Sequence, residues 1–486
     1  MNFIPDHATP CYDYLCTWNI QDQLARQLKW NDAGASGQRD ALNDAMLFDS
    51  DAYHPLNKTC RSGLMLVIDD GWDVPKGTAN LPGTPNVYGR CDPDTEKFPN
   101  YGDTPAERLK TLSQKVLEKG YCGLGLWISP QISGEDANQP ETLEKARAYW
   151  TERAQWCAEA GIRYWKIDWG IHGHSVPYRT MLTEVLKQYA PDVIVEHAVS
   201  LPPFTELGNP PWRKQQTADM LPISDVVRLY DVMEPLVSSS MLMRADEALS
   251  AASDYTAKYD VAGILNGEDC ASICAALGLA IGIMMEDPAN SGSEACIRWH
   301  RIAPPFSIWN GAYRTSEEIL TDAYYFEEDA ASWVKTKGKT MHESAPAVMA
   351  RNCDLPQVET DGVRPFICAS RHPETGACCI AAIQRTVNQQ INQVAPANVT
   401  FHIGSSDRLC GVFGCFESLT LEYDESITGR HVFAQDLMED EAHEITELCY
   451  LADHRLTIPG DVLTACGRRA RKPEDPCDPS CIIAIR

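Results

Sequence analysis

Carboxylate and tryptophan side chains recur where short apolar runs of the sequence end. Carboxylates accept hydrogen bonds from pairs of hydroxyl groups, and indole faces stack on the apolar C–H face of a sugar ring. A single aspartate at a strand end is more often a helix N-cap than a catalyst. Their repetition at successive run ends, however, predicts one carbohydrate-binding surface. The residues are Trp18, Asp69, Asp70, Trp72, Trp127, Lys166, Asp168, Glu196, Arg228 and Asp231.

Two such carboxyl groups facing each other could cleave a glycosidic bond with retention of configuration. One attacks the anomeric carbon, while the other gives and later takes back a proton, at a separation of about 5–5.5 Å. Asp168 is a candidate for the attacking group. Lys166, two residues earlier, points to the same face of its strand. Its ammonium group would keep the carboxylate ionised, as a nucleophile requires.

These residues can form one site only if the fold brings the ends of the strands together. Eight short apolar runs alternate with helical patterns through the first two-thirds of the chain. This alternation is typical of an α/β protein with a parallel (β/α)8 TIM barrel, in which functional groups gather at the carboxyl ends of the strands. One intervening helix has a capping box, Thr104 to Glu107, and a terminating glycine, Gly120. The predicted strands are residues 12–18, 64–69, 123–128, 163–168, 193–197, 226–230, 261–265 and 282–286.

The sequence pattern changes near Ala345. Alternating stretches such as Cys378–Ile383, Val399–Ile403 and Ser418–Tyr423 replace the helices, with Gly, Asp and Asn turns between them. Alternation with a period of two predicts half-buried strands, and a series of them predicts an antiparallel β-sandwich. We therefore predict a catalytic barrel over residues 1–344 and a C-terminal β-sandwich domain over residues 345–486.

The composition restricts the partners. The 486 residues include 42 basic and 68 acidic ones, and the resulting net charge of −26 repels nucleic acid and anionic lipid. No apolar run approaches the ~18 residues of a membrane span. We expect an oligosaccharide or glycoside substrate, no nucleic-acid or membrane partner and no cofactor. The oligomeric state stays open, a homo-oligomer included.

The 19 cysteines are odd in number, and several of them, such as Cys122, Cys270 and Cys274, lie inside apolar runs. This favours reduced, buried thiols over a disulfide framework. The segment Met1–Cys16 has no basic start followed by an apolar core, so it does not resemble a secretory signal. Both features predict a cytoplasmic location. No cysteine and histidine cluster has the layout of a zinc site, so no metal is expected.

Several motifs resemble those of glycoside hydrolase clan D, the α-galactosidase-like families 27 and 36. Leu66–Trp72 resembles the second-strand signature, Asp94–Pro99 the loop after it, Gly123–Trp127 the third strand and Tyr164–Asp168 the nucleophile strand. The second- and fourth-strand motifs are specific. The resemblance continues through Asn266–Glu268 into the terminal β-domain and covers most of the chain. It implies the barrel fold and a retaining, exo-acting hydrolase that cleaves a terminal sugar.

The resemblance also implies roles for individual residues. Asp168 takes the nucleophile position and would form a covalent glycosyl-aspartate. Asp69, Asp70 and Lys166 would bind sugar hydroxyls, and Glu196 lies in the region of a residue that recognises a hydroxyl or substituent.

The acid/base aspartate of these families follows an arginine by a few residues after strand six, a pattern that Arg228 and Asp231 fit. Asp225 competes with Asp231 for this role. It lies six residues earlier, roughly 20 Å back along an extended strand and toward the wrong end of the barrel, so Asp231 is favoured.

Departures from the family pattern leave the identity of the substrate's sugar undetermined. Where family 27 often has a cysteine after the nucleophile, this chain has Trp169, followed by two histidines of no predicted role, His172 and His174. An α-galactosidase is favoured. The alternatives are an α-N-acetylgalactosaminidase, a β-L-arabinopyranosidase, a transglycosylase and a catalytically inactive sugar-binding barrel. Glu196 opposite the 2-position would oppose an acetamido group.

Overall fold

The computed structural model describes residues 1–6, 11–28, 35–78, 87–198, 211–229, 238–284, 291–325, 340–387, 390–391 and 394–486. Its first part contains eight parallel strands, each of which overlaps a predicted run. They are β1 (Tyr14–Cys16), β2 (Met65–Ile68), β3 (Gly123–Ile128), β4 (Tyr164–Ile167), β5 (Ile194–Ala198), β6 (Val226–Arg228), β7 (Ile264–Asn266) and β8 (Gly282–Ile283). Their order in the sheet is β7-β6-β5-β4-β3-β2-β1-β8.

The sheet closes on itself between β7 and β8. Strand β1 pairs in parallel with β2 on one side and with β8 on the other. Ala280, just before β8, donates its amide to the carbonyl of Leu265 at 2.8 Å and accepts from the amide of Gly267 at 3.0 Å. These hydrogen bonds stand in for a longer β7–β8 ladder. The predicted parallel barrel is therefore confirmed.

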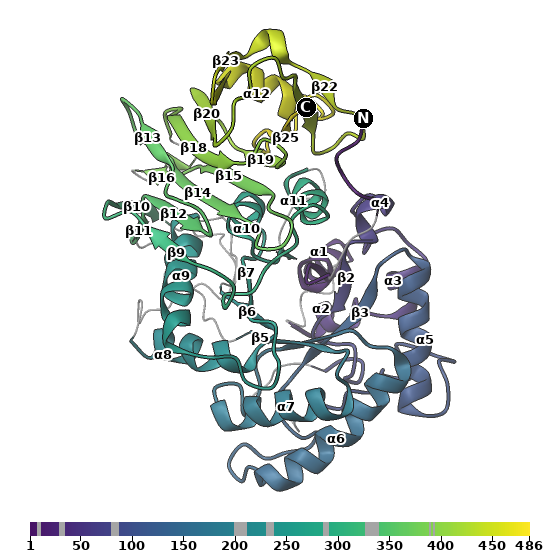
Figure 1. Ribbon diagram of the computed structural model, residues 1–486. Helices are drawn as coiled ribbons and strands as arrows, with labels where there is room; N and C mark the ends of the chain where they lie inside the picture. Colours follow the sequence, from purple (N-terminus) through teal and green to yellow (C-terminus); the bar gives the residue numbers. More distant parts are fainter. Residues whose placement is uncertain are drawn as a thin grey trace.

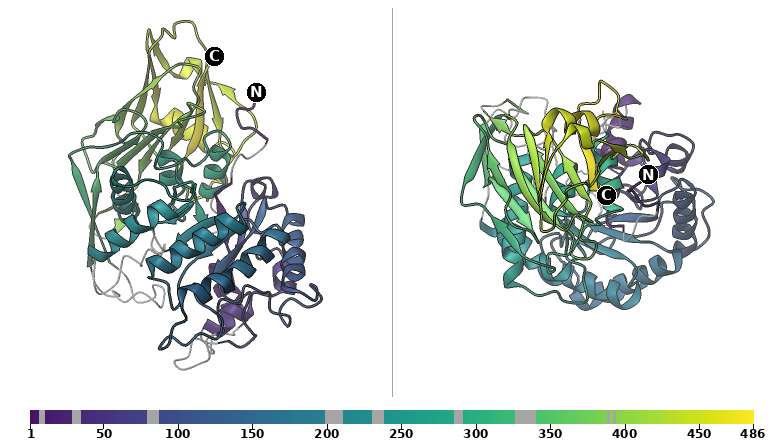
Figure 2. Two further views of the ribbon diagram at one scale, coloured as in Figure 1. Left: turned by 60° about the horizontal axis from the view of Figure 1, so that its bottom comes forward. Right: turned by 45° about the horizontal axis from the view of Figure 1, so that its top comes forward.

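Helices cover the outside of the barrel (Figures 1 and 2). Helix α5 (Pro105–Glu118) begins with the predicted capping box, in which Thr104 Oγ1 accepts from the amide of Glu107 and the Glu107 carboxylate accepts from the amide of Thr104. Helix α6 (Leu143–Ala160) ends at Gly161, whose φ of 71° is left-handed. The other helices of this part include α1 (Trp18–Gln27), α2 (Ala35–Asp40), α7 (Val176–Tyr189), α8 (Pro211–Met220), α9 (Ser238–Ala251), α10 (Ala271–Leu277) and α11 (Gly292–His300).

The barrel strands bury both of their faces. Inward-facing residues such as Met65, Val67 and Ile264 pack together inside the barrel. Outward-facing residues such as Leu66 and Ile167 pack with the surrounding helices. This double burial is why the strands have continuous apolar sequences instead of an alternating pattern.

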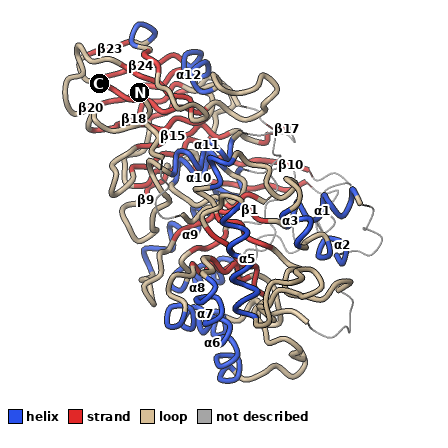
Figure 3. The backbone as a smooth tube through the Cα atoms, turned by 90° about the vertical axis from the view of Figure 1, so that its right-hand side faces the viewer, coloured by secondary structure: helices blue, strands red, loops and turns tan. Residues whose placement is uncertain are grey.

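The C-terminal part consists of two packed sheets, which form the strand-rich end of the molecule in Figure 3. The larger sheet contains β22 (His443–Glu444), β21 (Val432–Asp436), β25 (Ser480–Ile485), β19 (Cys410–Phe413), β15 (Cys378–Ile383), β14 (Phe366–Arg371), β12 (Val348–Arg351) and β9 (Tyr313–Thr315), in that order. The smaller contains β13 (Gln357–Glu359), β18 (Asn398–Gly404), β20 (Ser418–Tyr423), β24 (Arg455–Pro459) and β23 (Tyr450–Ala452).

The two sheets share one buried cluster, in which Ile380 and Val412 of the larger sheet join Phe401 and Leu421 of the smaller. The predicted β-sandwich is therefore present. Most neighbouring strands are antiparallel, while the pairs β12–β14, β15–β19 and β18–β20 are parallel.

The larger sheet also packs on the barrel. Trp299 of α11 lies so close to Gly411 of β19 that a Cβ atom there would be 2.9 Å from the indole. The amino terminus contacts the same part, because the amide of Phe3 donates to the Gln435 side chain at 2.7 Å. Strand β9 pairs with β12 although it lies upstream of Ala345. The division at residues 344 and 345 stays a prediction.

All 19 cysteines lie in the described residues and carry free thiols. Within the described ranges, no helix is long and apolar enough to cross a membrane. The same ranges contain no group of three or more His, Cys, Asp or Glu side chains placed to hold a metal ion.

Candidate active site

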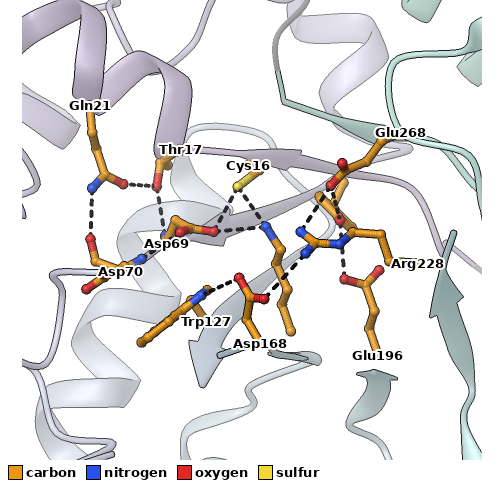
Figure 4. A network of polar contacts seen from close by, with 12 residues as sticks. Cys16, Thr17, Gln21, Asp69, Asp70, Trp127, Asp168, Glu196, Arg228 and Glu268 are labelled. Atoms are coloured by element: carbon orange, nitrogen blue, oxygen red, sulfur yellow. Dashed lines mark hydrogen bonds and ion pairs between the residues drawn. The ribbon is translucent and has the colours of Figure 1, made fainter. Parts of the chain in front are cut away.

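The carboxyl ends of adjacent barrel strands bring a group of polar side chains together on one rim (Figure 4). Trp127 lies on β3, Lys166 on β4 and Arg228 on β6, while Asp69 and Asp168 directly follow β2 and β4. Parallel strands place such residues at the same end of the barrel. The structure thus unites five of the predicted site residues.

Asp168 lies at the centre of this group. Its Oδ2 accepts a hydrogen bond from the indole Nε1–H of Trp127 at 3.0 Å, and its Oδ1 lies 3.4 Å from Nη2 of Arg228. The side chain is 21% exposed, so a ligand can reach it. Burial favours the neutral acid, but the charges of Arg228 and Lys166 and the Trp127 bond outweigh it and hold the pKa of Asp168 below its ordinary value. The carboxylate is therefore ionised at neutral pH.

Arg179 of α7 holds the backbone on which Asp168 stands. Its guanidinium donates to the carbonyls of Asp168 at 2.7 Å, Ile167 at 2.9 Å and Gly173 at 2.7 Å. Burial lowers the pKa of Arg179 to about 10, so the group is still charged at neutral pH. The sequence analysis missed this residue, because nothing in a helical sequence indicates which side chain reaches a strand end.

A buried ion pair lies beside Asp168. Nζ of Lys166 is 3.0 Å from Oδ2 of Asp69, and the thiol of Cys16 donates to the same oxygen at 3.0 Å. Burial opposes the charge on Lys166, but Asp69 outweighs it and raises the pKa of the lysine well above its ordinary value. The pair is a fixed dipole next to the carboxylate of Asp168. Hydroxyl binding by either residue stays a prediction.

The side chains of Asp70 and Trp72 are buried in hydrogen bonds to other groups of the protein. The two carboxylate oxygens of Asp70 accept from Nε and Nη2 of Arg39 at 2.8 and 2.6 Å. The Trp72 indole donates to the carbonyl of Trp127 at 2.9 Å. Both side chains are buried, so contact of either with a sugar would require a rearrangement. Arg39 lies on α2, remote from β2 in sequence, which is why sequence analysis did not pair it with Asp70.

Trp169 is an exposed aromatic side chain that directly follows Asp168. It is 41% exposed. Its ring centroid lies 5.3 Å from that of Trp127 and 4.9 Å from that of Tyr88. Trp127 itself is buried and Trp18 is half-buried. The sequence analysis placed Trp169 at the strand end but not among the sugar-binding residues; its position directly after Asp168 was the available signal.

Glu196 lies deeper, inside the barrel. Its Oε2 accepts from the Tyr164 hydroxyl at 2.8 Å and from Nδ2 of Asn266 at 3.0 Å, and the side chain is fully buried. Burial raises the pKa of Glu196, although Arg228 and Lys166 oppose the shift. Recognition of a sugar hydroxyl or substituent by Glu196 stays a prediction, and it would require this buried side chain to become accessible.

The two acid/base candidates have different outcomes. Asp231 lies outside the described residues, so its assignment stays a prediction. Asp225 lies at the opposite end of β6, where its carboxylate is 2.7 and 2.9 Å from Nζ of Lys187 and accepts from the amide of Val195 at 2.9 Å. That placement agrees with the argument against Asp225 as the acid/base group.

His172 and His174 attach the loop after β4 to neighbouring segments. Nε2 of His172 is 2.8 Å from Oε1 of Glu135, and its ring stacks on Tyr178 at 4.1 Å. Nδ1 of His174 accepts from the side-chain amide of Gln216 at 2.9 Å. Both histidines therefore brace the segment that follows Asp168.

Comparison with known proteins finds no matching family model and no matching curated protein. Solved structures do match over nearly the whole chain. The family 27 β-L-arabinopyranosidase of Geobacillus stearothermophilus is 11% identical, with a TM-score of 0.40 over 99% of this chain and 96% of that one. The α-galactosidase I of Mortierella vinacea is 11% identical, with a TM-score of 0.38 over 99% and 98%. The α-galactosidase of Saccharomyces cerevisiae, solved with raffinose, is 9% identical, with a TM-score of 0.37 over 98% of both chains. At such low identities, the function is inferred below from the site itself.

Proposed function

We propose that this protein is a retaining glycoside hydrolase and that Asp168 is its nucleophile. The observation that carries the proposal is the state of Asp168: an ionised, partly exposed carboxylate at the carboxyl end of a barrel strand, held by Trp127 and Arg228. Structural carboxylates of this chain, such as Asp70, are closed off by their counter-ion. An accessible, charged and fixed oxygen is what attack on a carbon centre requires.

The reaction follows from these groups. An oxygen of Asp168 bonds to the anomeric carbon as the bond to the leaving oxygen breaks, and an acid protonates that oxygen. Asp231 is our candidate for the acid. In the second step it removes a proton from water, the water oxygen displaces Asp168, and the sugar leaves with its original configuration. Arg228 and Trp127 hold the carboxylate so that little reorganisation is needed at either step.

The substrate is proposed to be a neutral glycoside. A net charge of −26 disfavours anionic sugars, and the exposed indole of Trp169 offers a stacking face beside the nucleophile. An exo-acting α-galactosidase is our first candidate. The alternatives with another glycone, transglycosylation and inactive sugar binding stay open. The burial of Glu196 weakens the argument that it opposes an acetamido substituent, so an α-N-acetylgalactosaminidase is included in the test below.

The test is a panel of aryl glycosides: α-galactoside, α-N-acetylgalactosaminide and β-L-arabinopyranoside. We expect turnover of one of them, with retention of configuration observed by NMR. Asp168→Asn should reduce it on the order of 10³-fold or more, because no covalent intermediate can form. Asp192→Asn is the matched control, since Asp192 is an exposed carboxylate before β5 at the other end of the barrel. Near-normal turnover by Asp168→Asn would disprove the assignment, and sugar binding without any turnover would favour the inactive barrel.

A further inference from the structure

A chain of buried, hydrogen-bonded groups connects the carboxyl end of β4 with α7, β5 and the turn before β6. Arg179 and Thr183 lie on α7, His197 lies on β5, and Ile223 ends a short 3-10 helix just before β6. Arg179 and Thr183 are one helical turn apart, so they face the same side of α7. All four residues are buried, which keeps water from competing for their hydrogen bonds.

Arg179 is the end of this chain that contacts the nucleophile strand. Its guanidinium makes four hydrogen bonds, three of them to the carbonyls of Ile167, Asp168 and Gly173. The fourth is donated by Nη1 to Nδ1 of His197 at 3.2 Å. Because a guanidinium group only donates hydrogen bonds, Nδ1 of His197 must present a lone pair and carry no proton.

Thr183 determines the state of the other ring nitrogen. Its Oγ1 lies 2.8 Å from the carbonyl oxygen of Ile223 and 2.9 Å from Nε2 of His197. A threonine hydroxyl has one proton, and a carbonyl oxygen can only accept. The proton of Thr183 therefore points to Ile223, and the hydroxyl oxygen accepts from an Nε2–H group of His197. Two separate contacts thus require the same ring, protonated on Nε2 and bare on Nδ1.

The charge state of His197 agrees with this geometry. A second ring proton, on Nδ1, would point at the guanidinium of Arg179. Burial, together with the charge of Arg179, lowers the pKa of His197 well below its ordinary value. The charged group that acts on the ring is Arg179 of α7, whereas Glu196, the preceding residue of β5, bonds to groups inside the barrel. His197 is therefore neutral at neutral pH.

His197 connects the nucleophile segment to a different strand. The three carbonyls that Arg179 holds all belong to residues 167–173, the segment that contains Asp168 and moves with it. Of the four acceptors of the guanidinium, the ring of His197 is the one outside this segment. A reacting group that is displaced by about 1 Å can lose on the order of 10²-fold in rate. The anchoring of Arg179 therefore bears on the position of Asp168.

We propose that His197 is a positioning residue: in its neutral, Nε2-protonated form it anchors Arg179, and Arg179 in turn fixes the backbone of Asp168. The importance of this anchoring for catalysis rests on the proposed function, in which Asp168 attacks the sugar. His197 is fully buried, so it acts through Arg179 and not on the substrate. A neutral histidine suits the position, because one ring accepts from a cation on one side and donates to a hydroxyl on the other.

The first experiment determines which ring nitrogen carries the proton and needs no substrate. The histidine rings are labelled with nitrogen-15, and the NMR signals of His197 are identified by their loss in His197→Asn. We expect a protonated Nε2 and an unprotonated Nδ1, with no change between pH about 5 and about 8. A proton on Nδ1, or titration of the ring within that range, overturns the proposal.

The second experiment separates the two hydrogen bonds of the ring. The amide of asparagine reaches the region of Nδ1, so His197→Asn can still accept from Arg179. Glutamine reaches the region of Nε2, so His197→Gln can contact Thr183 but not Arg179. On the aryl glycoside that the unaltered protein turns over, His197→Gln should lower kcat by about tenfold or more and change KM by less than about twofold. His197→Asn should keep kcat within about threefold of the unaltered value.

His54→Gln is the matched control. His54 is also buried and bonded through both ring nitrogens, to the carbonyl of Leu47 and the hydroxyl of Tyr121. Tyr121 precedes β3, at the end of the barrel opposite to Asp168, so His54→Gln should leave kcat unchanged. Equal losses of kcat in His197→Asn and His197→Gln, or no loss in His197→Gln, overturn the proposal.

Thr183→Val serves if His197→Gln does not fold. It keeps the shape of the threonine but removes the acceptor of the Nε2–H group, so the ring should lose its fixed protonation and kcat should fall. An unchanged ring and an unchanged kcat in this variant overturn the proposal.

A third measurement reports on Asp168 without any turnover. The indole Nε1–H of Trp127 donates to Asp168 at 3.0 Å, so its NMR signal, identified with Trp127→Phe, depends on the position of the carboxylate. The signal should shift in His197→Gln and stay near its place in His197→Asn, and an unmoved signal in His197→Gln overturns the proposal. Failure of the proposed function has a different signature: no glycoside is turned over, while this signal and the protonation of the ring still test the role of His197.

Discussion

Replacing Lys166 by methionine tests the electrostatics of the site most directly. Lys166 is buried and lies 3.0 Å from Asp69, which is buried as well. Coulomb's law at that distance, with an effective dielectric constant of about 20, gives an attraction of about 5.5 kcal/mol. Removing one partner of a buried pair costs about 3–5 kcal/mol, because the other charge is left without compensation. We expect Lys166→Met to lower the free energy of unfolding by that amount.

The assay is denaturant unfolding, with two further variants. The double variant Lys166→Met/Asp69→Asn removes both charges and should recover most of the loss. Lys187→Met is the matched control: its Nζ is 2.7 Å from Asp225, but the lysine is 20% exposed and Asp225 keeps two backbone amide donors. The decrease in the free energy of unfolding caused by Lys187→Met should be clearly smaller than that caused by Lys166→Met. A loss below about 1 kcal/mol for Lys166→Met, or a double variant no more stable than the single one, would refute the reasoning.

The same substitution has a predictable effect on the pH dependence of activity. The charge of Lys166 helps to hold the pKa of Asp168 below its ordinary value. Without it that pKa rises, so a smaller fraction of Asp168 is ionised in mildly acidic solution. The acid limb of kcat/KM should therefore move to higher pH. A limb that moves to lower pH would show that Lys166 does not act on Asp168 in this way.

Three further outcomes are expected. Thr104→Ala removes half of the capping box of α5 and should cost about 1 kcal/mol of stability in thermal unfolding; no loss would show that the cap is redundant. Burial raises the pKa of Asp73 from 3.8 to about 7, so the ionisation of Asp73 destabilises the folded state increasingly as the pH rises through that range. Asp73→Asn should therefore be more stable than the unaltered protein at pH about 8 but not at pH about 4. A gain in stability that does not depend on pH would contradict this. Trp169→Ala should leave the unfolding temperature nearly unchanged, because the indole is 41% exposed. If the indole stacks on the sugar, the substitution should lower kcat/KM roughly two- to tenfold. An unchanged kcat/KM would show that Trp169 does not bind the substrate.

Local patterns were enough to predict the barrel. Each strand has an apolar run of its own, and the helix ends are marked by residues whose effect is local, such as Thr104 and Gly161. Once the strands are known to be parallel, their carboxyl ends must meet, so Asp69 and Asp168 could be placed on one rim without coordinates. The spacing of Lys166 and Asp168 on one strand was likewise sufficient to put both at that rim.

The direction and depth of side chains could not be obtained in this way. Asp70 follows Asp69 immediately, yet it is bound by Arg39 from a helix remote in sequence. Glu196 lies at a strand end like Asp168, yet its strand places it inside the barrel, fully buried. The first outcome depends on where a helix packs and the second on the relative stagger of the barrel strands, and no local pattern records either.

The sequence by itself determined the elements, their parallel arrangement and the end of the barrel that carries charge, because periodicity, caps and strand spacing act over a few residues. Only the tertiary structure decided the chemical state of each group. Whether a carboxylate is ionised depends on its burial and on cations brought from other strands, as Arg228 and Arg179 are brought to Asp168. Coulomb interactions depend on distance in space, and folding sets those distances between residues that sequence separates.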